Sequence, residues 1–359
     1  MGIYLALIIT CLVFDLFTRN NKININIYKF LLFVVYSLLG YVSAIRYDVG
    51  RDYQHYVDIY QWINSPWINR TYEEPGFRSL VKLCGYLGYS YQSIFVISSL
   101  LLAISCYIFT INYVNIENWF LFAFLFICGG SYFSSMNLVR QYMAMSFILF
   151  ALVLLKYKKY ILTILLIILA VMFHKTAIFM SLPIVIAYFV KSIKKNYLLI
   201  GTFVIVFAIS MVGLDKSVAF VMRVIPFWKG YTTSHFLLER NYTALLKVIF
   251  PVLLFIYSYY IDNILERKNN YFYRLFFLGA LFYSGLSFLG AGNVAIWRIV
   301  ELFAPFFYVY ICNSSIFRIS EKYILYILII SYFLLLTIVT IFQMNGNGVM
   351  PYQSIFNIK

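Results

Sequence analysis

Two long stretches of this sequence contain no charged residue and few polar ones, Tyr160–Phe173 and Tyr323–Phe342. The strands of a membrane β-barrel would alternate apolar and polar residues, whereas these runs are continuous. Lipid offers the backbone no hydrogen-bonding partner, so an unbroken apolar run crosses it as a helix. This feature predicts an all-α polytopic membrane protein.

The composition excludes the soluble classes of protein. Hydrophobic residues make up 63% of the 359 residues and charged residues only 11%, against about 25% charged in a typical soluble domain. The net charge of +15 does not indicate nucleic acid as a partner, because the basic residues are scattered among short loops and form no long basic run. The expected partner is the lipid bilayer.

A window of about 20 apolar residues per crossing predicts about 12 transmembrane helices. They are expected near residues 2–17, 28–45, 92–113, 118–135, 138–155, 159–174, 176–190, 197–213, 244–261, 271–289, 295–312 and 322–342. The sixth and seventh are short, so they could instead form one broken helix or a re-entrant pair around His174. No soluble domain or repeat is evident, and residues 1–359 are expected to form one integral membrane domain.

Short basic connections set the expected orientation. They follow the odd-numbered spans and contain Arg19 and Lys22; Lys156, Lys158 and Lys159; Lys191, Lys194 and Lys195; Arg267 and Lys268; and Arg318 and Lys322. By the positive-inside rule, the side that carries them is cytoplasmic. Both chain ends and the loops 46–91 and 214–243 are therefore expected on the outer face.

Cysteine and histidine give no sign of a metal site. No Cys-x-x-Cys pair occurs, and four of the five cysteines lie in apolar stretches, as small buried hydrophobic residues do. The three histidines, His55, His174 and His235, are far apart and lack the i, i+4 spacing of metal-binding helices. We expect neither a metal nor a cofactor.

The loop 46–91 carries five of the thirteen acidic residues. If the loop begins with a helix, Asp52 and His55 share one side of it and Tyr53 and Tyr56 share another. The first side could supply an acid or a base, and the second could stack on a sugar ring. The same pattern also fits an amphipathic helix on the membrane surface with tyrosines at the headgroup level.

Single charges lie at other helix ends on the same expected face. A charged side chain costs about 2.5–3.5 kcal/mol at the centre of a span on insertion scales. Taken alone, Arg298 could be neutralised by Glu301 three residues later, and Lys175 could reach the interface. Together with Arg46 and Arg140, they provide the cations that a cavity for a lipid-linked diphosphate needs.

Four short motifs follow one another on this many-spanning chain. They are Arg46…Gly50-Arg51-Asp52-Tyr53…Tyr56, Glu74-Pro75-Gly76-Phe77, Val139-Arg140-Gln141…Ala144 and Phe173-His174-Lys175-Thr176-Ala177. In this order they resemble the EpsG-like branch of the Wzy-type polysaccharide polymerases of bacterial envelopes. The resemblance covers residues 25–310, and it departs from the family at Arg51, where a small or hydroxyl residue is common.

The resemblance implies an enzyme that joins oligosaccharide repeat units carried on undecaprenyl diphosphate, for an O-antigen, a capsule or another exopolysaccharide. The active site would face the periplasm from the bacterial inner membrane. The resemblance also implies a GT-C-like, metal-independent glycosyltransferase that moves the growing glycan onto a sugar hydroxyl of the next lipid-linked unit. It leaves open whether a chain-length regulator is a further partner.

This chemistry needs a base for the acceptor hydroxyl and cations for the leaving diphosphate. Asp52 is the first choice for the base, followed by His174 and then Glu74. The cations would be Arg140 and Arg298 first, then Arg46, with Lys175 in support. Tyr53 and Tyr56 would hold a sugar ring.

Three other activities remain open from the sequence. A flippase for the same lipid-linked sugars should carry charges along a path through the membrane, whereas nearly all charges outside the loops lie here at helix ends. An O-antigen ligase would use the same kind of donor but another acceptor. A multi-pass acyltransferase would use His174 or His55 as its base.

Overall fold

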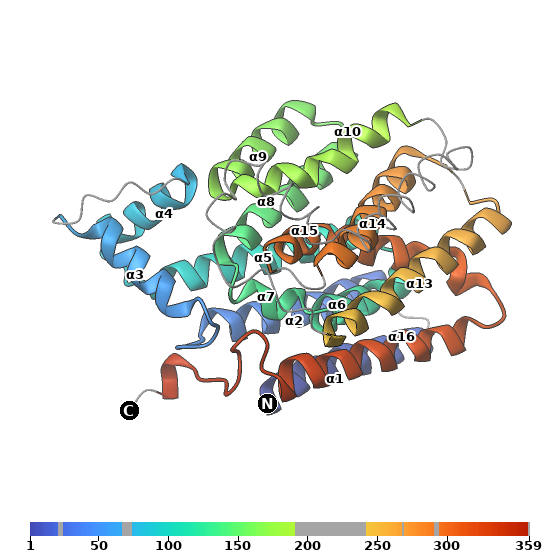
Figure 1. The fold of residues 1–359 in the computed structure, drawn as a ribbon, viewed down its shortest axis with the longest axis horizontal. Coiled ribbons are helices and arrows are strands. Elements are labelled where there is room, and N and C mark those ends of the chain that lie inside the picture. Colours follow the sequence, from blue (N-terminus) through green and yellow to red (C-terminus); the bar gives the residue numbers. More distant parts are fainter. Residues whose placement is uncertain (21–23, 67–73, 191–241, 268, 291–293, 358–359) are drawn as a thin grey trace. The chain divides into compact units, whose positions relative to one another are not determined.

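The computed structural model describes residues 1–20, 24–66, 74–190, 242–267, 269–290 and 294–357. Within these ranges the regular elements are helices, and an isolated bridge between Arg46 and Ser354 is the one piece of strand-like pairing (Figure 1). The predicted all-α architecture is therefore confirmed for the described residues.

The helices fall into two compact units, residues 1–181 with 333–359, and residues 182–332. The first unit contains α1 (Gly2–Asn20), α2 (Ile25–Ala44), α3 (Tyr53–Asn64), α4 (Pro75–Tyr86), α5 (Gln92–Tyr113), η1 (Ile116–Asn118), α6 (Trp119–Cys128), α7 (Ser131–Ser135), α8 (Val139–Lys156), α9 (Tyr160–Phe173), η2 (Lys175–Met180), the π-helix Ile338–Gln343 and η7 (Ile355–Asn357). The second contains α13 (Tyr242–Ile264), α14 (Tyr271–Gly290), α15 (Val294–Asn313) and η5 (Ser315–Arg318). The boundaries between the units lie at the start of α10 (Ser181–Phe189) and within α16 (Lys322–Thr337).

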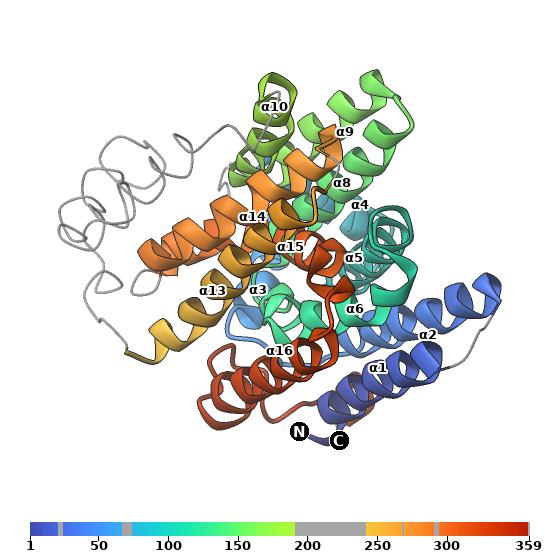
Figure 2. The same cartoon turned by 90° about the vertical axis from the view of Figure 1, so that its right-hand side faces the viewer.

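Long helices that pack side by side form the body of each unit. In the first unit α2 lies along α5, α5 along α8, and α8 along α9 (Figure 2). In the second unit α14 lies along α15, which both views show. Most of the buried side chains on these helices are apolar, with some serine and threonine among them.

Eight described helices are long and apolar enough to cross a membrane. They are Gly2–Arg19, Ile25–Ala44, Gln92–Tyr113, Val139–Lys156, Lys247–Ile264, Tyr271–Gly290, Ile296–Arg318 and Lys322–Gln343. Each coincides with one of the expected spans. The expected span 197–213 and almost all of the loop 214–243 lie outside the described residues.

The expected span 118–135 is wrong as a single helix. Helix α6 has only 10 residues, about 15 Å at 1.5 Å per residue, against about 30 Å for the hydrocarbon core. It ends because Gly130 adopts a left-handed conformation with φ +94°, after which the short α7 begins. All residues of α6 are buried, so its uniformly apolar sequence reflects packing on every side.

The expected spans 159–174 and 176–190 are also shorter than a full crossing. Helix α9 has 14 residues and ends at Phe173, where His174 is extended with φ −158° and ψ 117°. A 3₁₀ segment, η2, separates it from α10. The chain is therefore interrupted at His174, as both sequence-based alternatives, a broken helix and a re-entrant pair, expect.

The basic connections of the first unit gather at one end of its helices. Arg19 Nη2 donates to Asn118 Oδ1 over 2.9 Å, and Lys156 Nζ donates to the carbonyl of Asn112. These contacts join the end of α1 to η1 and the end of α8 to the end of α5. The loop 46–91 follows α2 and precedes α5, at the opposite ends of these helices.

Thiol labelling checks which end faces outward. In a variant without the five native cysteines, which are all buried, we expect Tyr86→Cys to react with a membrane-impermeant reagent in intact cells. Lys159→Cys should react only after the membrane is permeabilised, because Lys159 belongs to a basic connection that is expected inside. Both parent side chains are exposed. Labelling at Lys159→Cys in intact cells would overturn the orientation.

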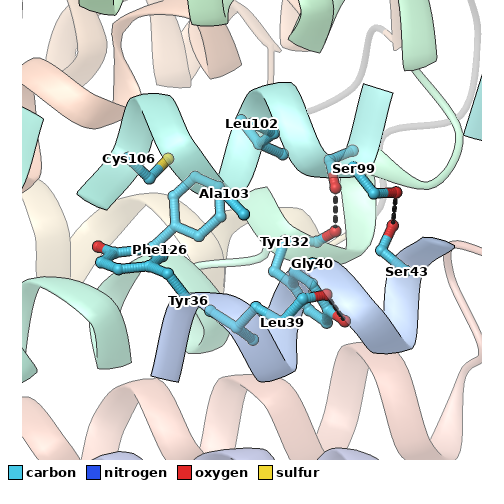
Figure 3. Close-up of a pocket in the computed structure, with 11 residues that line it drawn as sticks. Tyr36, Leu39, Gly40, Ser43, Ser99, Leu102, Ala103, Cys106, Phe126 and Tyr132 are labelled. Carbon is cyan, nitrogen blue, oxygen red and sulfur yellow. Dashed lines mark hydrogen bonds between the residues drawn. The ribbon is translucent and has the colours of Figure 1, made fainter. Parts of the chain in front are cut away.

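Small residues bring α2 and α5 close together near the end of these helices that is expected to face outward. A Cβ on Gly40 would lie 3.0 Å from the Cβ of Ala103, so glycine permits the close approach. One turn further along, Ser99 Oγ donates to Ser43 Oγ over 2.8 Å, and both serines line a small pocket between these helices (Figure 3). This polar layer lies directly beneath Arg46.

Candidate functional site

Arg46 is held at the C-terminal end of α2. Its Nη1 donates to the carbonyl of Ser43 over 2.6 Å and to Ser43 Oγ over 2.8 Å, and its Nη2 donates to the Met136 carbonyl over 3.4 Å. The guanidinium also lies 4.6 Å from the ring centre of Phe95. Burial lowers the pKa of Arg46 to about 10, which leaves it charged at neutral pH. With 1% exposure, Arg46 joins three segments and presents no open face to a ligand.

Gly50 makes the turn that leads from Arg46 into α3. Its φ of +106° is a conformation that L side chains rarely adopt, and a Cβ there would lie 2.8 Å from Asn137 Oδ1 and 2.9 Å from the Met136 carbonyl. Only glycine fits on both grounds. The glycine of the first motif thus lets the chain pass close to the start of α8.

The expected helix after this turn is present as α3, but its tyrosines face the core. Tyr53 is 1% exposed and Tyr56 3%. The ring of Tyr53 stacks on Phe95 with 4.4 Å between centroids, and the ring of Tyr56 meets Phe77 edge to face. The structure therefore gives both rings packing partners within the first unit, and their contact with a sugar ring stays a prediction.

A buried carboxylate joins three of the four motifs. Glu74 Oε2 lies 2.6 Å from Arg140 Nη1, and Glu74 Oε1 lies 2.7 Å from His174 Nδ1. The Glu74 side chain is 8% exposed, whereas Arg140 and His174 are 25% and 22% exposed. A carboxylate thus lies beneath a cation and an imidazole that both reach the surface.

Local sequence explains how Glu74 comes to this position. Pro75 occupies the first turn of α4, where its fixed φ suits a helix start, so Glu74 is the extended residue before the helix. A Cβ on Gly76 would lie 2.7 Å from the ring of Phe173 and 3.0 Å from the backbone of Met172. Glycine at this point lets the start of α4 touch the end of α9, and His174 follows directly.

Aromatic rings hold Arg140 on the other side. Arg140 lies in the first turn of α8, and its guanidinium is 5.9 Å from the ring centre of Tyr56 and 6.0 Å from that of Phe77. Such contacts favour a planar guanidinium over an ammonium group. The rings of Tyr56 and Phe77 therefore help to hold the guanidinium of Arg140 beside Glu74.

Two opposing effects act on the pKa of Glu74. Burial raises it, but the hydrogen bond from His174 and the charge of Arg140 together lower it further, so the pKa lies below the ordinary value of 4.5. Glu74 is therefore an anion at neutral pH and can only accept hydrogen bonds. Nδ1 of His174 must then carry a hydrogen, which leaves Nε2 of the neutral ring as the nitrogen able to take up a proton.

The remaining predicted residues lie around this cluster or in the second unit. Asp52 precedes α3 and is half-buried, and Lys175 follows His174 at the start of η2, also half-buried. Arg298 lies near the start of α15, in the second unit. The structure thus brings Glu74, Arg140 and His174 into direct contact.

A second group of charged side chains lies in the second unit. Glu301, 8% exposed, accepts a hydrogen bond over 3.0 Å from Nε1 of Trp297, four residues earlier. Lys247 Nζ lies 5.7 Å from the Trp297 ring centre. Lys247 was not singled out from the sequence, although its place in the first turns of an apolar helix is the same signal that pointed to Arg140.

Within the part of the chain that the structure describes, no group of three or more His, Cys, Asp or Glu side chains could hold a metal ion. Glu74 and His174 are in contact, but no third side chain of these types completes a group with them among the described residues. What the cluster can do is accept a proton at His174 and present a positive charge at Arg140, beside a carboxylate that fixes both.

The described residues thus define a multi-pass helical membrane protein with a carboxylate held between an arginine and a histidine at one end of a helical unit. The chain belongs to the EpsG family, whose model matches residues 3–354. The resemblance seen in the four motifs is therefore confirmed, and membership indicates a general role in polysaccharide polymerisation. No curated protein and no solved structure matches the chain.

Proposed function

We propose that this protein polymerises oligosaccharide repeat units that are carried on undecaprenyl diphosphate. The observation that carries the proposal is the Glu74 cluster, because it places a proton acceptor and a cation within contact distance of one carboxylate. Glycosyl transfer from a lipid diphosphate needs both groups. Family membership supplies the general class of reaction.

His174 is the base in this proposal and Glu74 its positioning residue. Nε2 of His174 removes the proton of an acceptor sugar hydroxyl as the oxygen attacks the anomeric carbon of the donor glycan. The bond between that carbon and the diphosphate oxygen breaks, and undecaprenyl diphosphate leaves with the bonding electrons. Glu74 keeps the hydrogen on Nδ1 and stabilises the imidazolium that forms, the role a carboxylate has beside a catalytic histidine. Asp52, the first choice from sequence, is the second choice here.

Arg140 is proposed to stabilise the charge that develops on the leaving diphosphate. Its guanidinium is a quarter exposed and is already oriented by Glu74 and two rings, so little reorganisation is needed at the moment of reaction. Arg298 and Lys175 remain proposed supporting cations. Arg46 is better explained as a joint between segments because it is buried and bound to neutral oxygens.

The proposed setting is the bacterial inner membrane with the Glu74 cluster facing the periplasm. Lipid-linked units would reach it from the outer leaflet. Cleavage of the glycosyl–diphosphate bond would drive the transfer, so no nucleotide is needed. A chain-length regulator is a proposed partner of the same complex. The number of units joined would then depend on how long the growing chain stays bound.

One reconstitution tests the proposed function. Purified protein in detergent or lipid, given only the lipid-linked repeat unit, should produce a ladder of products that differ by one unit, with release of undecaprenyl diphosphate. The matched control is the same preparation with His174→Ala, which should give no ladder. A flippase or a ligase would leave the repeat unit unchanged under these conditions, so an intact substrate with active, folded protein would reject the proposal.

A further inference from the structure

The segment near the C-terminus packs against the turn that carries the first motif. Figure 1 shows this red segment beside the blue end of α2. Backbone groups of the two segments are hydrogen-bonded: Tyr47 N to Gln353 O at 3.0 Å, Ile355 N to Ile45 O at 2.9 Å, Gly50 N to Gly348 O at 2.9 Å and Arg51 N to Asn347 O at 3.2 Å. We call residues 345–355 the C-terminal strap.

One carbonyl of the strap bonds both to the first motif and to the residues just before the third. The Asn347 oxygen accepts from Arg51 N over 3.2 Å and from Asn137 Nδ2 over 2.9 Å. Arg51 directly precedes Asp52 and α3, and Asn137 precedes the start of α8, three residues before Arg140. The strap therefore fixes the spacing between the two segments that carry the candidate residues Asp52 and Arg140.

The strap has a defined conformation of its own. Asn345 is left-handed, with φ +45°, and its side-chain amide makes two bonds to the backbone of Met350, over 2.6 Å and 3.0 Å. Val349 is fully buried, and its carbonyl accepts from Tyr4 OH over 3.2 Å. This closed loop is a built element of the first unit.

We infer that the C-terminal strap is a positioning element of the active site, which holds the Gly50 turn against Asn137 and thereby aligns α3 with Arg140. The inference rests on the proposed function for its catalytic consequence. Without the strap, the backbone amides of Gly50 and Arg51 lose their acceptors, and the left-handed turn at Gly50 loses the contacts that stabilise it. A misplacement of about 1 Å in such a site can cost a hundredfold in rate.

Gly348→Ala tests the inference in the full-length protein. Gly348 has φ +64°, and a Cβ there would lie 2.8 Å from Arg51 Cγ and 3.2 Å from Arg51 N, so the added methyl group pushes the strap off the turn. Deuterium uptake of a peptide covering residues 46–56 should rise severalfold. The kcat for polymerisation should fall about tenfold or more with little change in KM, because alignment and not substrate affinity is lost.

Gly88→Ala is the matched control. Gly88 also has a left-handed φ, +74°, but a Cβ there meets no atom within 4 Å, so the variant carries the same backbone strain without the contact. We expect its exchange in residues 46–56 and its kcat to match the unaltered protein. Exchange across α8 serves as the internal check that Gly348→Ala does not loosen the whole unit.

A second pair of variants tests the inference in case Gly348→Ala does not fold. Asn345→Ala removes both bonds to Met350 and should act like Gly348→Ala, whereas Asn347→Ala keeps the backbone carbonyl and should act like the control. Unchanged exchange in Gly348→Ala and Asn345→Ala, or full activity despite a loosened turn, would overturn the inference. If the unaltered protein makes no polymer, the proposed function fails, and the exchange comparison alone decides whether the strap holds the turn.

Discussion

Glu74→Gln should reduce polymerisation about a hundredfold or more, within the range that one acid–base group contributes. Glutamine is nearly the same size as glutamate but carries no charge, and its amide nitrogen can only donate. Either Arg140 or His174 would then face a donor in place of the oxygen that now lies 2.6 or 2.7 Å away. The measurement is the length distribution of the glycan in a complementation strain at matched protein level in the membrane.

Stability should fall as well. Two hydrogen bonds to a buried charge are weakened, and a bond to a charged group contributes about 1.5–3 kcal/mol, so we expect the free energy of unfolding to drop by about 2 kcal/mol. Glu117→Gln is the matched control, because Glu117 is exposed. Near-normal glycan with Glu74→Gln would show that the cluster is not part of the site.

The pKa of Glu74 sets the direction in which pH changes the stability that its contacts with Arg140 and His174 contribute. Because the folded-state pKa lies below 4.5, the stabilisation is fully present above that value and is lost as the pH falls through the lowered pKa. Glu74 therefore contributes no change in stability between about pH 5 and pH 8. The complementation strain used for Glu74→Gln can also decide which residue is the base. If Asp52→Asn abolishes long glycan and His174→Ala does not, the assignment of the base passes to Asp52.

Most of the helices could be predicted because their signal is local. The runs 92–113 and 271–289 needed only their own apolar residues, and they form α5 and α14 within a residue of the expected ends. The segment 118–135 failed for a reason that hydropathy ignores. Gly130 ends the helix by its backbone conformation, so a continuous apolar run became two short elements.

The candidate site could be named but not assembled. Glu74 and His174 are 100 residues apart, and each motif alone suggested only a charge at a helix end. The glycines carried more information than their charged neighbours: Gly50 and Gly76 each lie where a Cβ would collide with another segment. A glycine beside a candidate residue therefore indicated a close approach, but not the segment that approaches.

The C-terminal strap gave no sequence signal because its contacts use backbone carbonyls. Asn347 bonds Arg51 and Asn137 through its main-chain oxygen, which any residue would supply. The tyrosines of α3 show a different limit of the sequence pattern. Their spacing on one helix side was correct, but periodicity cannot tell whether that side faces a ligand or, as for Tyr53 on Phe95, another helix.

Arg140→Lys should abolish most long glycan although it keeps the charge. The guanidinium bonds Glu74 through Nη1 and lies beside the rings of Tyr56 and Phe77. A planar group can make these contacts while its other edge faces the leaving diphosphate. An ammonium group is more strongly hydrated and offers no such fork. Lysine should therefore retain the ion pair with Glu74 but lose the bidentate grip on phosphate, so we expect about a tenfold to hundredfold loss with normal membrane insertion.

The comparison variant is Arg78→Lys, the same change within α4, which should give glycan of normal length. Isolating chemistry from binding needs the purified protein and the lipid-linked repeat unit. If Arg140 stabilises the charge of the leaving diphosphate, the change lowers kcat and kcat/KM together, because the interaction strengthens only in the transition state. If KM rises while kcat is unchanged, Arg140 only binds the substrate in its ground state. Wild-type chain lengths from Arg140→Lys would make the guanidinium a structural partner of Glu74 and remove the diphosphate assignment.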